Sequence, residues 1–183
     1  MSPGMNRVLA LAAAVAFGAV AAHAQQGGEW ESDFDENKKD WKEIEAKIPA
    51  YPKDANLIEF DGGPATPHHF FIDSQSLSIG TDGVVRYTLV IKAAGGAINV
   101  TYEGIRCETR EQKYYAVGQR DGTWTRARNP QWRRIELREV NRQHNTLYND
   151  FLCNGGLNRG APARSVRDIV QAMKYGQPGK IVD

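Results

Sequence analysis

Long apolar runs are almost absent from this chain, and the one near its start, Val8–Ala21, is too short for a membrane-spanning helix. Arg7 precedes this run and Ala22-His23-Ala24 follows it, which is the three-part pattern of a secretory signal peptide cleaved before Gln25. No cysteine follows the run, so a lipid anchor on a new N-terminal cysteine is excluded. We expect residues 1–24 to be removed and the mature protein to be soluble and periplasmic, with a retained N-terminal anchor as the alternative.

Cysteine is scarce, because Cys107 and Cys153 are the only two in the chain. A thiol-based metal or redox site needs CxxC-like spacing or further ligands nearby, and the sequence has neither. In an oxidising compartment, an isolated pair is most simply a disulfide. The two residues lie 46 positions apart (153 minus 107). A crosslink closing such a loop stabilises the fold by about 4 kcal/mol in the chain-entropy model.

An excess of charge of one sign is also missing. Lys and Arg number 23, and Asp and Glu number 22. Removal of residues 1–24 takes away one Arg and no acid, so 22 of each remain (23 minus 1) and the net charge is zero. Neutrality argues against a general binder of nucleic acid or anionic membranes. The roughly 160 residues left are enough for one domain with its own core.

Catalytic and metal-binding motifs are lacking as well. No serine lies in a Gly-x-Ser-x-Gly elbow, and Gly95-Gly96 and Gly155-Gly156 lack the Lys-Ser/Thr ending of a phosphate-binding loop. His68, His69 and Asp73 are metal-ligand types. Adjacent strand residues point to opposite faces, however, and no third strong ligand has a defined spacing. We expect no metal, no cofactor and no catalytic residue.

Alternation of apolar and polar residues is the clearest pattern that is present. Val84–Lys92 has the two-residue period of a half-buried strand, and Ala97–Cys107 repeats it after a glycine-containing loop. In the second strand the inward positions switch from even to odd numbers at Gly104, which predicts a bulge or bend. Its charged residues and those just beyond it are expected to pair on the surface: Glu103, Arg106, Glu108 and Arg110.

Further strands complete an antiparallel meander. Asp121-Gly122 is a strong hairpin signal between Lys113–Arg120 and Thr123–Arg128. Shorter strand candidates lie earlier, at Ala55–Phe60 and His68–Ile72.

Three segments have helical spacing: Asp40–Ile48, Asn145–Cys153, and a helix opened by Ser165 and stopped at Gly176. An antiparallel sheet with one apolar face needs a cover, and the last helix is the natural one. The apolar side of the first helix would carry Trp41, Ile44 and Ile48.

These elements predict an α+β fold, a mainly antiparallel β-meander forming a curved sheet or partial barrel covered by a C-terminal helix. We divide the chain into a signal peptide (1–24), an acidic N-terminal arm with a short helix (25–54), a single β-rich domain with the C-terminal helix (55–178) and a tail (179–183). The pattern of residues 133–144 fits a strand or a helix and remains unassigned.

The stretch Tyr102–Cys107, preceded by Val84–Val90 and followed by Tyr114-Tyr115-Ala116 and Trp124, resembles the cryptic neisserial protein family of bacterial envelope proteins. The likeness extends over roughly Glu29–Met173, and Cys153 stands where the family pattern would place its second cysteine. The resemblance implies a periplasmic protein of one domain. It implies no particular chemistry.

The most distinctive polar feature is a basic run from Arg126 to Arg142, with Trp124 just before it and Trp132 within it. Arginine beside tryptophan can bind polyanions, glycan carboxylates or phosphates. The alternative is that these arginines face the acidic arm within the molecule or are simply solvated. As candidate ligand-binding residues we take Arg126, Arg128, Trp132, Arg133, Arg134 and Arg138.

The absence of a complete catalytic set and the presence of this basic run together favour a periplasmic binding or interaction module of the cell envelope without enzymatic activity. Its partner would be an envelope protein or a polyanionic ligand. The alternatives are an envelope-polymer hydrolase using scattered acids with His68 or His69, and an assembly or structural factor of the outer membrane.

Overall fold

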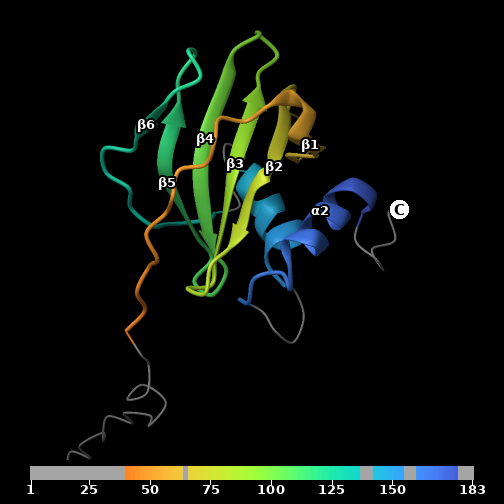
Figure 1. Ribbon diagram of the computed structural model, residues 1–183. Helices are drawn as coiled ribbons and strands as arrows, with labels where there is room; N and C mark the ends of the chain where they lie inside the picture. Colours follow the sequence, from red (N-terminus) through yellow and green to blue (C-terminus); the bar gives the residue numbers. More distant parts are fainter. Residues whose placement is uncertain (1–39, 64–65, 137–141, 155–159, 177–183) are drawn as a thin grey trace, which may run out of the picture. The chain divides into compact units, whose positions relative to one another are not determined.

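The computed structural model describes residues 40–63, 66–136, 142–154 and 160–176. Within these residues, seven strands form one antiparallel sheet in the order β1-β2-β3-β4-β5-β6, and the short β7 also pairs with β5 (Figure 1). Each strand in that order lies beside the next in sequence, so the sheet is a meander, and it stays open. The predicted α+β meander is confirmed. The strands are β1 (Leu57–Phe60), β2 (His69–Ile79), β3 (Val84–Lys92), β4 (Ile98–Arg106), β5 (Glu111–Gly118), β6 (Trp124–Arg126) and β7 (Arg133–Arg134).

Helical segments cover one face of the sheet. They are α1 (Arg142–Thr146), the π-helical turn η3 (Leu147–Leu152) and α2 (Val166–Tyr175), while the 3-10 turn η1 (Asp54–Asn56) precedes β1. The N-cap of α2 is the predicted one, because the Ser165 hydroxyl accepts a hydrogen bond from the Asp168 N–H at 3.1 Å. We call the covered side the helix face. Its buried residues include Ile72, Val85, Tyr87, Leu89, Ile105, Leu147, Leu152 and Ile169.

The register between β3 and β4 runs unbroken from Val84 opposite Arg106 to Lys92 opposite Ile98. The predicted switch of inward positions at Gly104 is therefore wrong. Both faces of β4 are buried: Ile105 lies on the helix face, whereas Tyr102 lies on the other. The register does shift between Tyr102 and Glu103, but on the side of β5, where one extra residue is accommodated.

An extended segment, residues 40–53, crosses the second face of the sheet (orange in Figure 1). We call it the strap, and the side that it covers the strap face. The helix predicted over Asp40–Ile48 is not formed, because none of these residues is helical. Ile44, which a helix would have buried together with Trp41, is instead 44% exposed. Hydrogen bonds between the strap and the sheet replace those that a helix would have made within itself.

The tight turns follow the sequence. Between β5 and β6 the Gly122 N–H donates to the Gln119 carbonyl at 3.1 Å, and Gly122 has a φ of 82°. This left-handed conformation favours glycine, so the Asp121-Gly122 hairpin is confirmed. In the unassigned stretch 133–144, a two-residue strand is followed by a helix that begins at Arg142, three residues before the predicted start at Asn145.

Candidate functional site

The strap is fastened to the sheet near its start. The Trp41 indole Nε1 donates to the Asp82 carbonyl at 2.8 Å, and the Ile44 N–H donates to the Asp82 carboxylate at 2.9 Å. Arg86, on β3, donates to the Ile44 carbonyl at 2.9 Å and also pairs with Asp82 at 2.6 Å. Farther along, the Tyr51 hydroxyl donates to the Gln119 carbonyl at 2.9 Å. These bonds hold an irregular segment in a defined position across the strands.

Glu43 is the charged centre of this contact. Its carboxylate accepts hydrogen bonds from Lys113 Nζ at 2.6 Å, from the Tyr115 hydroxyl at 2.8 Å and from Trp132 Nε1 at 3.2 Å. Arg86 Nη2 lies 3.9 Å away. Partial burial acts to raise the pKa of Glu43, but the hydrogen bonds from Lys113 and Tyr115 outweigh it, so the pKa lies below its ordinary value. Glu43 is therefore held as an anion.

A hollow of about 280 Å³ opens beside this carboxylate. The strap forms one wall through Glu43, Glu45 and neighbouring residues, and Lys113 and Tyr115 of β5 lie opposite. Arg126 of β6 lines the same hollow, next to Ala127 and Pro130. The Glu43 contacts therefore lie within reach of solvent rather than sealed in the core.

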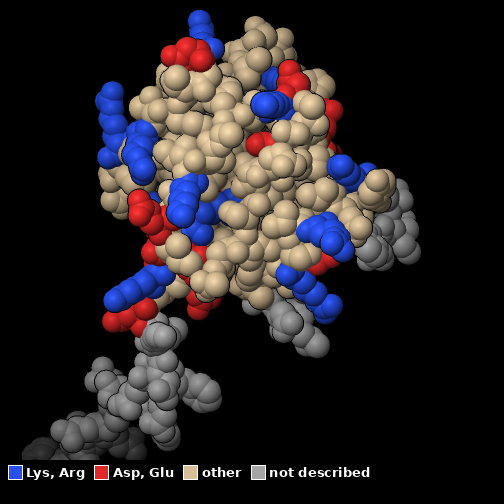
Figure 2. All heavy atoms as spheres, viewed as in Figure 1, with Lys and Arg blue, Asp and Glu red and all other residues tan. Residues whose placement is uncertain are grey.

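The predicted ligand-binding arginines lie in and next to β6 and β7, the short strands that pair with β5 at the outer edge of the sheet. Arg126, Arg128, Arg133 and Arg134 are all exposed, and we call these four residues the basic edge. Basic side chains gather over the β6 side of the view in Figure 2. Within the described part of the chain, none of the four has an acidic partner. Arg138 lies outside the described residues.

The basic edge does not form a single plane. Arg133 stands opposite Gln112, which is itself opposite Ile105 of the helix face. Arg134 stands opposite Glu111, which is itself opposite Arg106 of the strap face. Directly opposite residues share a face of the sheet, so the edge presents guanidinium groups to both sides.

Trp132, by contrast, is already engaged inside the molecule. Its ring meets Trp41 edge to face with centroids 5.8 Å apart, and its Nε1 is bonded to Glu43. Lys113 lies 5.6 Å from the ring centroid. Trp132 therefore does not share the exposed surface of the arginines with which the sequence grouped it, because its ring packs against the strap.

The acidic arm does form ion pairs within the molecule, but its described partners are not the arginines of the basic run. Within the described residues, Glu43 pairs with Lys113 and Arg86 rather than with any arginine of the basic edge. Arg106 stacks on the Trp41 ring at 4.0 Å and pairs with Glu108 at 2.7 Å. The arm before residue 40 lies outside the described residues.

A second polar cluster lies inside the core, on the helix face. Glu103 Oε2 is 2.7 Å from His144 Nε2 of α1 and accepts a hydrogen bond from the Tyr87 hydroxyl at 3.1 Å. Each side chain of the Glu103–His144 pair is 1% exposed. Thr101 donates to the other oxygen of Glu103 at 2.5 Å. Burial, followed by the charge and hydrogen bond of Glu103, raises the pKa of Tyr87 well above its ordinary value.

The prediction that Glu103 pairs on the surface is wrong, because its side chain is buried. No sequence pattern had predicted the cluster. Continuous alternation through β4 would have put Glu103 on the same side as Ile105. A charged residue on an apolar face requires a buried partner. That rule was the available signal for the cluster, although it does not identify His144.

His68 and His69 are held apart by different partners. His69 Nδ1 lies 2.7 Å from Glu59 of β1, while the Ala94 N–H donates to His68 Nδ1 at 3.3 Å. Asp73 is buried and accepts a hydrogen bond from the Gln75 N–H. In the described residues, no group of three or more His, Cys, Asp or Glu side chains is placed to hold a metal ion.

A family model matches most of the chain, from residue 36 to residue 174. The chain belongs to the CNP1-like family. This agrees with the resemblance to the cryptic neisserial protein family that the β4 and cysteine motifs indicated. No curated protein and no solved structure matches the chain.

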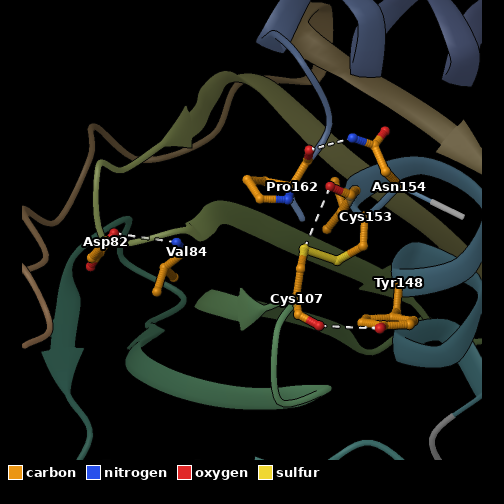
Figure 3. The surroundings of a disulfide bond; sticks show 8 residues. Asp82, Val84, Cys107, Tyr148, Cys153, Asn154 and Pro162 are labelled. Atoms are coloured by element: carbon orange, nitrogen blue, oxygen red, sulfur yellow. Dashed lines mark hydrogen bonds between the residues drawn. A yellow bond between two sulfur atoms is a disulfide. The ribbon is translucent and has the colours of Figure 1, made fainter. Parts of the chain in front are cut away.

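The matched region of this CNP1-like protein contains the strap, the whole sheet, both cysteines and the helical segments except the last residue of α2. Cys107 and Cys153 form the predicted disulfide, with Cα atoms 5.6 Å apart (Figure 3). The bond joins the end of β4 to the residue after η3, and the Tyr148 hydroxyl donates to the Cys107 carbonyl beside it at 3.1 Å. Among the described helices, none is both long and apolar enough to cross a membrane.

Proposed function

We propose that this CNP1-like protein is a periplasmic, non-enzymatic module of the cell envelope that binds an anionic partner through its basic edge. The observation that carries the proposal is the contrast between two sets of cations. Arg86, Lys113, Arg106 and Arg110 each have a partner inside the molecule. The four arginines of the basic edge are exposed and have no acidic partner among the described residues.

The geometry of the edge suits an extended anion. Arg126 stands opposite Ala116 and Arg133 opposite Gln112, so the two are separated by four residues of β5, or about 13 Å at ~3.3 Å per residue. Guanidinium groups bind carboxylates and phosphates with paired hydrogen bonds. Export is supported by the signal-peptide pattern of residues 1–24 and by the disulfide.

Exposed arginines on an edge strand have a second known effect, which is to prevent edge-to-edge association of sheets. The two roles differ in what their removal does. Loss of a binding edge lowers retention on an anionic probe, whereas loss of a protective edge raises self-association. A hydrolase acting through His68 or His69 has less support, because the two imidazoles have separate partners.

The test uses the mature, oxidised protein and immobilised dextran sulfate as the anionic probe. We expect the Arg126→Ser/Arg128→Ser and Arg133→Ser/Arg134→Ser variants each to bind roughly tenfold more weakly, since two charge-assisted contacts are lost in each. The matched control is Arg164→Ser/Arg167→Ser, which removes two exposed arginines at the start of α2. Equal weakening in the control, or no weakening at the edge, would contradict the proposal. Pull-down from envelope extract with the same variants then identifies the partner.

A further inference from the structure

The contacts around Glu43 have the composition of an anion-binding site. Three donors converge on one carboxylate: an ammonium from Lys113, a phenol hydroxyl from Tyr115 and an indole N–H from Trp132. A guanidinium, that of Arg86, lies 3.9 Å away. Such a set, combining charged donors with neutral ones, is the usual means of binding a carboxylate or phosphate group.

The donors and the acceptor come from different parts of the fold. Arg86 and Lys113 lie in β3 and β5, and Tyr115 is the extra residue of β5 at the register shift opposite Tyr102 and Glu103. The acceptor is carried by the strap, which has no regular secondary structure of its own. A strand that is paired on both sides opens far less readily than an irregular segment fastened by a few side chains. The sheet therefore holds Arg86, Lys113 and Tyr115 in place, and Trp132 lies in the connection between β6 and β7. Glu43 is on the segment that is able to leave.

The ion pairs of these residues support the same conclusion. Arg86 is paired closely with Asp82, at 2.6 Å, so these two neutralise each other. Lys113 has Glu43 as its ion-pair partner. Without Glu43, one positive charge and two neutral donors would remain in a half-buried position beside the hollow of about 280 Å³. Desolvated donors without a partner are costly, so a replacement anion would be bound favourably.

We infer that Lys113, Tyr115 and Trp132, supported by Arg86, form an oxyanion site that the strap residue Glu43 fills in cis, and that an external carboxylate or phosphate group occupies this site when the strap lifts. The site is distinct from the basic edge: Arg126 lines the hollow but makes no contact with Glu43 among the described residues. The inference therefore stands or falls independently of the proposed function.

The experiment vacates the site in the mature, oxidised protein and supplies inorganic phosphate or acetate as the probe, with chloride at matched ionic strength. The variant is Glu43→Ala. The readout is the indole N–H signal of Trp132 in the ¹H–¹⁵N spectrum, assigned among the four tryptophans by Trp132→Phe. We expect a saturable shift in Glu43→Ala, with binding at least about tenfold tighter than in the wild-type protein, where Glu43 competes.

Two matched variants give the control. Glu45→Ala removes an exposed acid that lines the same hollow without contacting these donors, and it should behave as the wild type does. Glu43→Ala/Lys113→Met removes the charged donor, and it should lose the saturable shift. A preference for acetate indicates a carboxylate-bearing ligand and a preference for phosphate indicates a phosphate-bearing one; both support the site.

A destabilised Glu43→Ala protein still tests the inference through its melting temperature. Phosphate or acetate should then raise the melting temperature of Glu43→Ala above its value in chloride, and should not do so for Glu43→Ala/Lys113→Met. Two results would overturn the inference. One is a folded Glu43→Ala protein with no saturable response to either anion. The other is an equal response in the variant that lacks Lys113.

Discussion

Glu103 and His144 meet at 2.7 Å in the core, although 41 positions separate them in the sequence. This contact fastens α1 to the middle of the sheet. The ring of Tyr114 lies edge to face with the imidazole, at 6.0 Å between centroids. Within the described residues, His144 Nδ1 has no hydrogen-bond partner. The pair is therefore desolvated. Glu103 also accepts hydrogen bonds from Tyr87 and Thr101, whereas Glu103 is the hydrogen-bond partner of the imidazole among the described residues.

The first prediction concerns this pair. Glu103→Ala should lower the free energy of unfolding by about 3–5 kcal/mol, because it leaves a buried polar partner without its counterpart. Urea unfolding of the single variants and of Glu103→Ala/His144→Ala completes a double-mutant cycle. The coupling energy should be of the order of 0.5–3 kcal/mol. Strictly additive losses would show that the two side chains do not support each other.

The second prediction concerns the disulfide. The replacement Cys107→Ser/Cys153→Ser should lower the free energy of unfolding by about 4 kcal/mol, since the bond closes a 46-residue separation. Urea unfolding of the oxidised protein and of the double variant measures the difference. Thiol titration of the denatured, unreduced protein is the control and should find no free sulfhydryl. Two free sulfhydryls would contradict the fold described above.

The third prediction concerns acid. Desolvation acts to raise the pKa of Glu43, but its hydrogen bonds and the charge of Lys113 lower it overall. A carboxylate whose pKa is depressed on folding adds stability above its unfolded pKa, about 4.3 for Glu, and this stability is lost as the pH falls through the folded pKa. Glu43→Gln should therefore destabilise the protein at pH 7 and have a smaller effect at pH 3.

Urea unfolding midpoints of the wild type and Glu43→Gln at both pH values measure this effect. Glu45→Gln is the matched control and should leave the midpoint unchanged at pH 7, because Glu45 is exposed. Burial raises the pKa of Asp73, so this residue shifts the pH dependence of stability in the direction opposite to Glu43. A difference between wild type and Glu43→Gln that is the same at pH 7 and pH 3 would show that the Glu43 contacts are not electrostatic.

Much of the sheet could be read from local patterns. In β3, apolar residues recur at every second position, and Val85, Tyr87 and Leu89 are all buried on the helix face. The hairpin at Gly122 and the Ser165 cap depend on short-range backbone chemistry, so neighbouring residues specify them. The disulfide followed from arithmetic, because only one pairing of two cysteines exists.

The helix predicted for the strap and the switch of inward positions predicted for β4 were wrong for the same reason. Trp41, Ile44 and Ile48 have helical spacing, and β4 has apolar residues on both of its sides, as Tyr102 and Ile105 show. Periodicity assumes that a segment has one buried side. In this fold the sheet has two covered faces, and the strap's polar groups bond to Asp82, Lys113 and Tyr115 across the strands.

Neighbouring residues along the chain were thus sufficient for most of the strands, the Gly122 hairpin, the cap of α2 and the crosslink. Local sequence patterns could not predict the contacts between residues far apart in the chain: Glu43 with Lys113 and Trp132, and Glu103 with His144. Spacing along a strand or helix repeats within a few residues, so it carries information about nearby positions only. Tertiary packing decides these contacts. The positions of the strap and the helices on the two faces of the sheet determine which charged side chain contacts which donor.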